Sequence, residues 1–138
     1  MVAARYNGEV VERLLAGAVA ALDAAGVAAT DRAVVRVPGA WEIPLALERL
    51  ARGGRFDALV ALGAVIRGDT AHFAYVAGEC SRGIMEVALR HALPVGFGVV
   101  TCDDLDQALA RAGGAAGNKG AEAVQAALAT VRELEQGT

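Results

Sequence analysis

The chain has 138 residues, the size of one ordinary domain, and we expect residues 1–138 to form a single domain. Hydrophobic residues make up 55% of the chain and aromatic residues only 4%, which predicts an ample core held by close backbone packing more than by large rings. The net charge of −3 argues against nucleic acid as a partner, because phosphate backbones bind basic faces.

The first half of the chain alternates strand and helix patterns. Residues 2–5 are expected to be a short strand, and Asn7 is expected to cap the long helix that follows. Residues 32–37 are the second expected strand. The pattern at residues 40–50 is helical, and Pro44 is tolerated there because it falls in the first turn, where a missing N–H is no loss.

The second half continues the same alternation and ends with an extra helix. Residues 56–66 are a near-continuous apolar run, which predicts a strand covered on both faces. A long helix is expected at residues 73–92, a fourth strand at 94–101 and a helix at 105–112. Two glycines interrupt the pattern before Asn118-Lys119-Gly120 leads the last helix. This alternation predicts a three-layer α/β/α fold around a four-stranded parallel sheet.

The distinctive polar and aromatic residues follow the expected strands. They lie in residues 6–7, 38–42, 67–72 and 101–104. Carboxyl ends of parallel strands meet at one edge of the sheet, where α/β proteins bind ligands. In the third of these loops Gly68 permits a sharp turn, the free N–H groups of the next helix can hold an anion, and His72 can exchange a proton near neutral pH. We therefore expect a small-molecule site that includes a phosphate at this edge.

Some candidates also have plainer interpretations. Asp69 or Thr70 can be an ordinary helix N-cap, and the carboxylate of Asp69 repels phosphate unless it is turned away. His91 falls near a helix C-terminus, where a histidine is often only a favourable surface charge. The chain shows no Ser–His–Asp order, no phosphate loop ending in Gly-Lys-Ser/Thr and no metal-ligand spacing, so we expect no metal.

The remaining candidates divide in the same way. Tyr6 and Trp41 are either core side chains or the walls of a binding site. Glu42 is either a ligand-binding carboxylate or a partner of the helix dipole. Arg111 and Lys119 are either phosphate ligands or solvated charges.

Cysteine content and hydropathy indicate the compartment. The two cysteines, Cys80 and Cys102, suggest no disulfide framework and fit a reducing environment. Residues 1–5 lack the apolar core of a signal peptide, and no uncharged apolar run approaches the ~20 residues of a membrane span. We expect a cytoplasmic protein with no membrane partner.

Taken together, the motifs resemble those of the lumazine synthase family, which catalyses the penultimate step of riboflavin biosynthesis. The matching stretches are Arg5-Tyr6-Asn7 and residues 37–44, 62–73, 94–101 and 107–122. They run over nearly the whole chain in the family's order. The resemblance implies a flavodoxin-like sheet with strand order 2-1-3-4.

The resemblance also implies a condensation. The amine of 5-amino-6-(D-ribitylamino)uracil attacks the ketone of 3,4-dihydroxy-2-butanone 4-phosphate, an imine forms, phosphate leaves and the ring closes to 6,7-dimethyl-8-ribityllumazine, with release of water. The substrate brings its own nucleophile, which explains why the chain needs no activated serine or cysteine. No cofactor is implied.

Roles carry over to this sequence residue by residue. His72 would be the proton donor and acceptor. The pyrimidine and its ribityl chain would be bound by Tyr6, Ala40, Trp41, Glu42, Ala64, Val65, Ile66 and, from a neighbouring subunit, Phe97. The phosphate would be bound by Asp69, Thr70, Arg111 and Lys119. Tyr6 and Trp41 depart from the family's usual phenylalanine, which keeps the aromatic face but changes its size.

The implied partners are small-molecule substrates and copies of the chain itself. Members of the family form homopentamers with the site between subunits, and some pentamers join into decamers or icosahedral 60-mers. Met85 and Leu89 widen the apolar stripe of residues 73–92, which suits a buried subunit contact. The short first strand favours assemblies without shells.

Two other functions fit the same fold. An archaeal-type riboflavin synthase would condense two lumazines without any phosphate, and Arg111 with the loop at residues 68–72 argues against it. A non-catalytic flavin-binding or shell-forming scaffold would have lost turnover, and the presence of both His72 and Arg111 argues against that.

Overall fold

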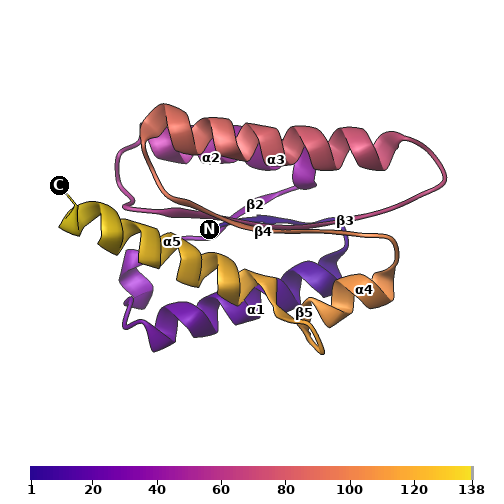
Figure 1. Ribbon diagram of the computed structural model, residues 1–138, viewed down its shortest axis with the longest axis horizontal. Coiled ribbons are helices and arrows are strands. Elements are labelled where there is room, and N and C mark those ends of the chain that lie inside the picture. The colour runs from indigo at the N-terminus through magenta and orange to yellow at the C-terminus, as the bar shows by residue number, and fades with distance from the viewer. Residues whose placement is uncertain (138) are drawn as a thin grey trace.

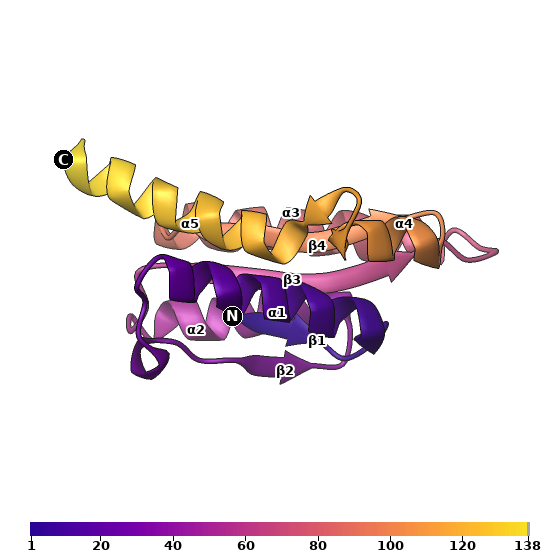
Figure 2. The ribbon, with the colours of Figure 1, turned by 90° about the horizontal axis from the view of Figure 1, so that it is seen from below.

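In the computed structural model, which describes residues 1–137, a four-stranded parallel sheet lies between two layers of helices (Figure 1). The strands are β1 (Val2–Ala4), β2 (Val35–Val37), β3 (Leu59–Ile66) and β4 (Val95–Cys102). Their order is β2-β1-β3-β4, and each neighbouring pair is parallel (Figure 2). The predicted three-layer α/β/α, flavodoxin-like architecture and its strand order are confirmed.

All five predicted helices are present. They are α1 (Gly8–Ala24), α2 (Ile43–Arg52), α3 (His72–His91), α4 (Leu105–Ala110) and α5 (Lys119–Gln136). Helices α2 and α3 cover one face of the sheet, and α1, α4 and α5 cover the other (Figure 1). Two short 3₁₀ turns, Ala29–Asp31 and Ala40–Glu42, precede β2 and α2.

A small hairpin between α4 and α5 was not predicted. Strands β5 (Ala112–Gly114) and β6 (Gly117–Asn118) pair antiparallel where the sequence indicated only an interruption between helices. Gly113 has φ of 99° and Gly117 has φ of 80°, a region of backbone space that favours glycine. The hairpin therefore needs both glycines, and it turns the chain back toward α1.

Strand β3 organises the core. Seven of its eight residues are buried, which confirms that both faces of the predicted apolar run are covered. Alternate residues of β3 belong to two apolar clusters, one beneath α1 and α5 and one beneath α2 and α3. The largest fully buried side chains are aliphatic: Leu14, Ile43, Leu47, Leu59 and Leu62.

Close backbone packing, as predicted from the composition, holds α5 against its neighbours. A Cβ built on Gly120 of α5 would lie 2.0 Å from the carbonyl oxygen of Leu14 in α1. A Cβ built on Gly96 of β4 would lie 2.2 Å from the carbonyl oxygen of Ala123. Neither position has room for any side chain, so the helices approach the sheet and each other at backbone distance.

Asn118 fixes the start of α5 to α1. Its Oδ1 accepts hydrogen bonds from the backbone N–H groups of Gly120 at 2.9 Å and Ala121 at 3.1 Å, which caps the helix. Its Nδ2 donates to the carbonyl oxygen of Arg13 in α1 at 3.0 Å. Packing alone therefore explains Asn118 and Gly120 in the Asn118-Lys119-Gly120 run.

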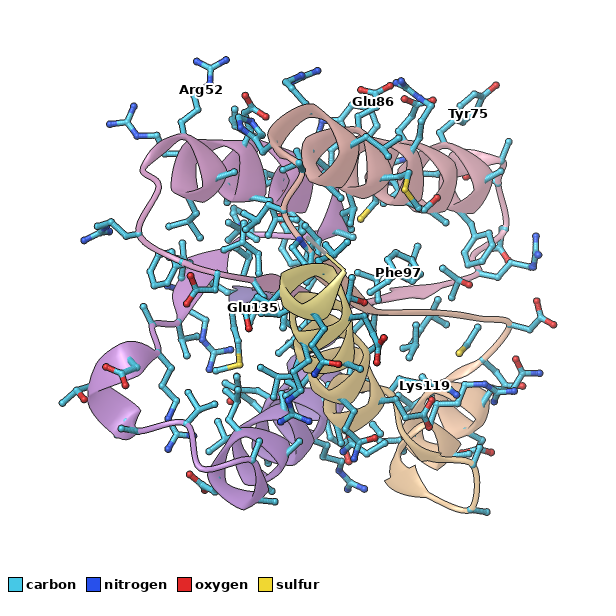
Figure 3. All side chains as sticks on the ribbon, turned by 60° about the vertical axis from the view of Figure 1, so that its left-hand side comes forward. Arg52, Tyr75, Glu86, Phe97, Lys119 and Glu135 are labelled. Carbon is cyan, nitrogen blue, oxygen red and sulfur yellow. The ribbon has the colours of Figure 1, made fainter. Side chains whose placement is uncertain are left out.

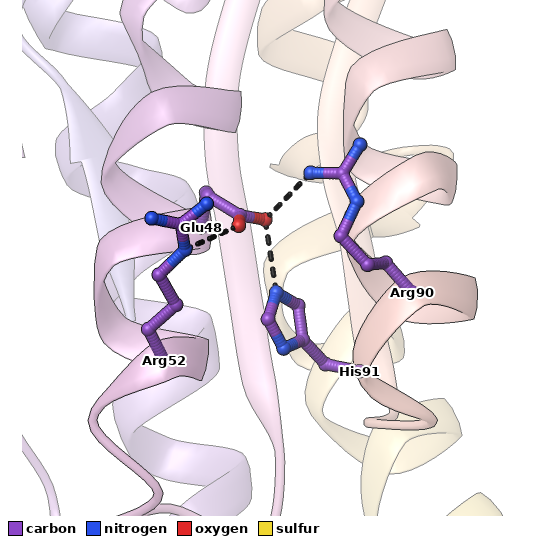
Figure 4. A network of polar contacts seen from close by, with 4 residues as sticks. All are labelled: Glu48, Arg52, Arg90 and His91. Carbon is purple, nitrogen blue, oxygen red and sulfur yellow. Dashed lines mark hydrogen bonds and ion pairs between the residues drawn. The ribbon is translucent and has the colours of Figure 1, made fainter.

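A polar network joins the C-terminal ends of α2 and α3 (Figure 4). The carboxylate of Glu48 meets Arg52 at 2.8 Å, Arg90 at 3.1 Å and His91 at 3.0 Å. The hydrogen bond with His91 is the main cause that lowers the pKa of Glu48. His91 thus ties two helices together at the edge of the sheet opposite to the predicted site.

Candidate functional site

The four loops at the carboxyl ends of the strands meet, as predicted. The backbone N–H of Tyr6 donates to Pro38 O at 2.9 Å, which joins the loops after β1 and β2. Asn7 Nδ2 donates to Ala64 O of β3 at 2.9 Å. Arg67 Nε donates to Asp103 Oδ1 at 2.8 Å, which joins the loops after β3 and β4.

The loops after β1, β2 and β3 surround a cavity of about 270 Å³, and the loop after β4 is not part of its lining. Predicted site residues among its lining are Tyr6, Ala40, Ala64, Val65, Ile66, Thr70 and His72. The lining also includes Asn7, Gly68, Phe73 and Val76. The cavity thus combines an exposed aromatic ring, the end of a buried strand and the first turn of α3.

The strand β3 presents main-chain groups to this cavity because it extends beyond its neighbour β1. Pairing between β1 and β3 ends at Leu62, whereas pairing with β4 continues to Ile66. On the β1 side, residues 64–66 therefore have no strand beside them in the described chain. Asn7 satisfies the Ala64 carbonyl there, and the following main chain faces the cavity.

Asn7 occupies the predicted N-cap position of α1, but its side chain does not cap the helix. It adopts a left-handed conformation with φ of 56° and makes no side-chain cap hydrogen bond. Its amide reaches across to β3 instead and lines the cavity. Asparagine tolerates left-handed backbone better than most residues, but capping and bridging roles have the same sequence signal.

His72 begins α3 and is exposed to the cavity. Its backbone N–H donates to Thr70 Oγ1 at 3.3 Å, so Thr70 serves the helix start even though Ala71 occupies the N-cap position. Asp69 is exposed and lies outside the cavity lining. The start of α3 thus places the imidazole of His72 at the cavity, next to the loop that carries Thr70.

The aromatic candidates are not core residues. Tyr6 is 67% exposed and Trp41 is 58% exposed, so the core-packing interpretation of both was wrong. The Tyr6 ring lies against Gly39, where an added Cβ would be 2.7 Å from Tyr6 Cδ2. Glu42 Oε2 accepts a hydrogen bond from Gly39 N at 2.9 Å, which closes the turn that carries Trp41.

The two basic candidates lie together, outside the lining of this cavity. Lys119 N donates to Arg111 O at 2.8 Å, and the Lys119 ammonium pairs with Glu122 at 2.6 Å. Arg111 Nη1 donates to the carbonyl oxygen of Gln107 at 3.0 Å. Arg111 is the C-cap residue of α4, so the hairpin and the end of α4 position both cations.

Phe97 lies elsewhere, in a second and larger depression of about 570 Å³ between α3, β4 and α5. Figure 3 shows it at the edge of the sheet, between the two helices. Phe97 is 48% exposed, and Leu89 beside it is 74% exposed. Because β4 is the last strand of the sheet, this apolar edge is open along the described chain.

None of the helices within residues 1–137 combines the length and the apolar character that a membrane span needs. Within the same range, no group of three or more histidine, cysteine, aspartate or glutamate side chains is placed to hold a metal ion.

Comparison with known proteins identifies the family. The family model described as 6,7-dimethyl-8-ribityllumazine synthase matches residues 1–135. The protein of that name from Desulfovibrio desulfuricans is 50% identical over 136 residues, which cover 99% of this chain and 87% of that protein. The protein of the same name from Nitratidesulfovibrio vulgaris is 48% identical over 136 residues, with the same coverage. On this similarity over nearly the whole chain, the protein belongs to the 6,7-dimethyl-8-ribityllumazine synthase family.

Proposed function

We propose that the chain is a transferase of riboflavin biosynthesis that condenses 5-amino-6-(D-ribitylamino)uracil with 3,4-dihydroxy-2-butanone 4-phosphate to 6,7-dimethyl-8-ribityllumazine, phosphate and water. Family membership supports the reaction. The observation that carries it to this chain is the cavity in which Tyr6, the end of β3 and His72 come together.

The reaction requires the protein mainly to position the two substrates and to transfer protons. The substrate amine attacks the ketone, the imine loses phosphate and the ring closes. Holding the two reactants together lowers the barrier by making the attack effectively unimolecular. His72 is within the cavity and can carry protons between the amine, the carbinol and the leaving group.

The pyrimidine fits the wall formed by β3 and the exposed rings. We assign stacking to Tyr6 and Trp41, which are too exposed to serve the core of the described chain. Val65 and Ile66 meet the heterocycle through main-chain groups that β1 leaves unpaired, and Ala40 and Ala64 pack beside it. Glu42 keeps one carboxylate oxygen for the ribityl hydroxyls, since Gly39 N engages the other.

We place the phosphate between the loop at residues 68–70 and the cationic pair of Arg111 and Lys119. We assign Asp69 and Thr70 to the loop that surrounds it, and Arg111 and Lys119 to its charge. An arginine can hold two phosphate oxygens at once, whereas a lysine acts as a point charge. No cofactor or metal is part of this proposal.

The site is completed in a homopentamer. The cavity of one chain is at the small end of typical ligand sites, which measure ~300–1,000 Å³. Phe97 and the basic pair lie outside its lining, and Phe97 with Leu89 forms an open apolar edge. We propose that Phe97 packs on the ring of a substrate bound by the neighbouring subunit.

The buried free thiols of Cys80 and Cys102 suit a reducing cytoplasm.

A direct assay tests the reaction. We expect the purified protein mixed with both substrates to form the lumazine chromophore and release phosphate faster than the same mixture without protein, because the substrate amine reacts slowly unaided. Absorbance of the lumazine and a phosphate assay measure the two products. A control with the lumazine as sole substrate tests for a riboflavin synthase. Formation of riboflavin there, with no acceleration of the first reaction, would contradict the proposal.

Replacing His72 by alanine should lower kcat by about 10²-fold, the lower end of general acid–base effects, because the substrate amine retains its own reactivity. Steady-state kinetics and thermal unfolding measure the outcome. His91→Ala is the matched control, since His91 lies in the Glu48 network at the opposite edge and should leave kcat unchanged. A His72→Ala variant that loses its fold would instead identify a structural histidine.

A further inference from the structure

Arg67 makes contacts in three directions from the end of β3. Its Nε donates to Asp103 Oδ1 at 2.8 Å, and its guanidinium carbon lies 4.4 Å from the centre of the Phe73 ring. Its backbone N–H donates to Cys102 O at 2.9 Å. A planar guanidinium suits this arrangement because it can stack on a ring while its edge donates to a carboxylate.

The contacts of Arg67 continue beyond Asp103. Asp103 N donates to Gln107 Oε1 at 2.9 Å, and the carbonyl oxygen of Gln107 accepts from Arg111 Nη1 at 3.0 Å. The hydrogen bond from Arg67 is the main cause that lowers the pKa of Asp103. An unbroken series of contacts therefore leads from Phe73, the neighbour of His72, to Arg111.

The loop that Arg67 begins has few fixed points of its own. Residues 67–70 are exposed, and glycine at position 68 adds backbone freedom. An arginine in this place would ordinarily be expected to bind an anion directly. Here Asp103 and Phe73 engage its guanidinium from the edge and from the face.

We propose that Arg67 is a positioning residue for the phosphate substrate. Paired with Asp103 and stacked on Phe73, it holds the loop at residues 67–71 and the first turn of α3 at the correct place relative to the end of β4. It does not itself bind the phosphate. This inference rests on the proposed function, because it deepens the account of the same site.

The test compares Arg67→Gln with Asp103→Asn. Each should raise KM for the phosphate substrate by about 3- to 10-fold, because an exposed ion pair and a cation–π contact are individually weak but act here on one loop. KM for the pyrimidine should change by less than about 2-fold in both. The double variant should be little worse than either single variant, since both remove one shared interaction.

The sign of the Asp103→Asn effect separates positioning from direct binding. If Arg67 bound the phosphate itself, removal of its competitor would free it and lower KM, and that result would overturn the proposal. Unchanged kinetics in both variants would overturn it too, because the pair would then be only a solvated surface contact. Arg67→Lys should be intermediate, since lysine keeps a charge for Asp103 but loses the planar stack.

Two controls keep this test distinct from that of the proposed function. Arg36→Gln removes another exposed ion pair, with Glu12 at 2.6 Å, and should leave both KM values unchanged. A wild-type chain without turnover would contradict the function itself. The thermal shift produced by inorganic phosphate then tests Arg67 separately: we expect a stabilisation of the wild type that is reduced in Arg67→Gln and in Asp103→Asn. An equal shift in all three proteins would overturn the inference.

Discussion

Replacing Arg111 by alanine is expected to lower kcat/KM for the phosphate substrate by roughly 30- to 1,000-fold, or about 2–4 kcal/mol. Most of the loss should appear as a higher KM, because the guanidinium holds the phosphate before and during the reaction. Steady-state kinetics with the phosphate substrate varied at saturating pyrimidine would measure it. The effect is large because the site is partly desolvated, so water cannot replace the charge interaction that the phosphate loses with Arg111.

The fold should tolerate this change. Arg111 contributes its carbonyl oxygen to the contact with Lys119 N and its own N–H to the C-cap of α4, and alanine keeps both. The side chain gives up one hydrogen bond to Gln107 O. Arg132→Ala, at an exposed position of α5, is the matched control and should leave the kinetics unchanged. Equal kinetics in the Arg111 variant and this control would remove Arg111 from the site.

The order of the elements was predictable because the hydrophobic pattern records which faces are covered. The apolar run ending at Ile66 is long and unbroken, and the strand it predicts is buried on both faces. The edge strand β4 exposes Phe97 within a strand that is otherwise mostly buried, and its apolar run still predicts a strand. Glycines at packing contacts, such as Gly96 and Gly120, agree with the low aromatic content.

The local details were not predictable where one residue type serves two geometries. Asn7 stands at the N-cap position, but tertiary contacts decide that its amide bridges to β3 and does not cap α1. The pair Gly113-Gly114 predicted only an interruption between helices, whereas the left-handed positions of the hairpin are Gly113 and Gly117. Only the contact of Asn118 with α1 shows why the chain turns back there.

The candidate site was predictable in the part that one chain builds. The rule that ligands bind at carboxyl ends of strands predicts Tyr6 and His72 at one edge of the sheet, and both line the same cavity, while their roles in binding and catalysis stay predictions. It says nothing of what lies between chains, so the roles of Phe97 and Lys119 come from the family resemblance and stay predictions. Their positions outside the cavity lining make the assembled protein the object on which they must be tested.

Gly120→Ala should destabilise the protein by about 3 kcal/mol, near the upper end of overpacking effects. The added methyl carbon would sit 2.0 Å from the carbonyl oxygen of Leu14, and a backbone oxygen cannot move aside as a flexible side chain would. Helix α5 would have to shift away from α1, which breaks the hydrogen bond of Asn118 to Arg13 O. Urea denaturation followed by circular dichroism, at fixed protein concentration because assembly adds to stability, would measure the loss.

Gly8→Ala is the matched control for this prediction. Gly8 also lies in the first turn of a helix, but it has nothing within 4 Å of the position a Cβ would take. Alanine there should be neutral or stabilise the protein by up to about 1 kcal/mol, because it restricts the unfolded chain. Equal denaturation midpoints for the two variants would show that α1 and α5 do not meet at backbone distance. In that case the packing of α5 on α1, which positions the hairpin between Arg111 and Lys119, would be wrong.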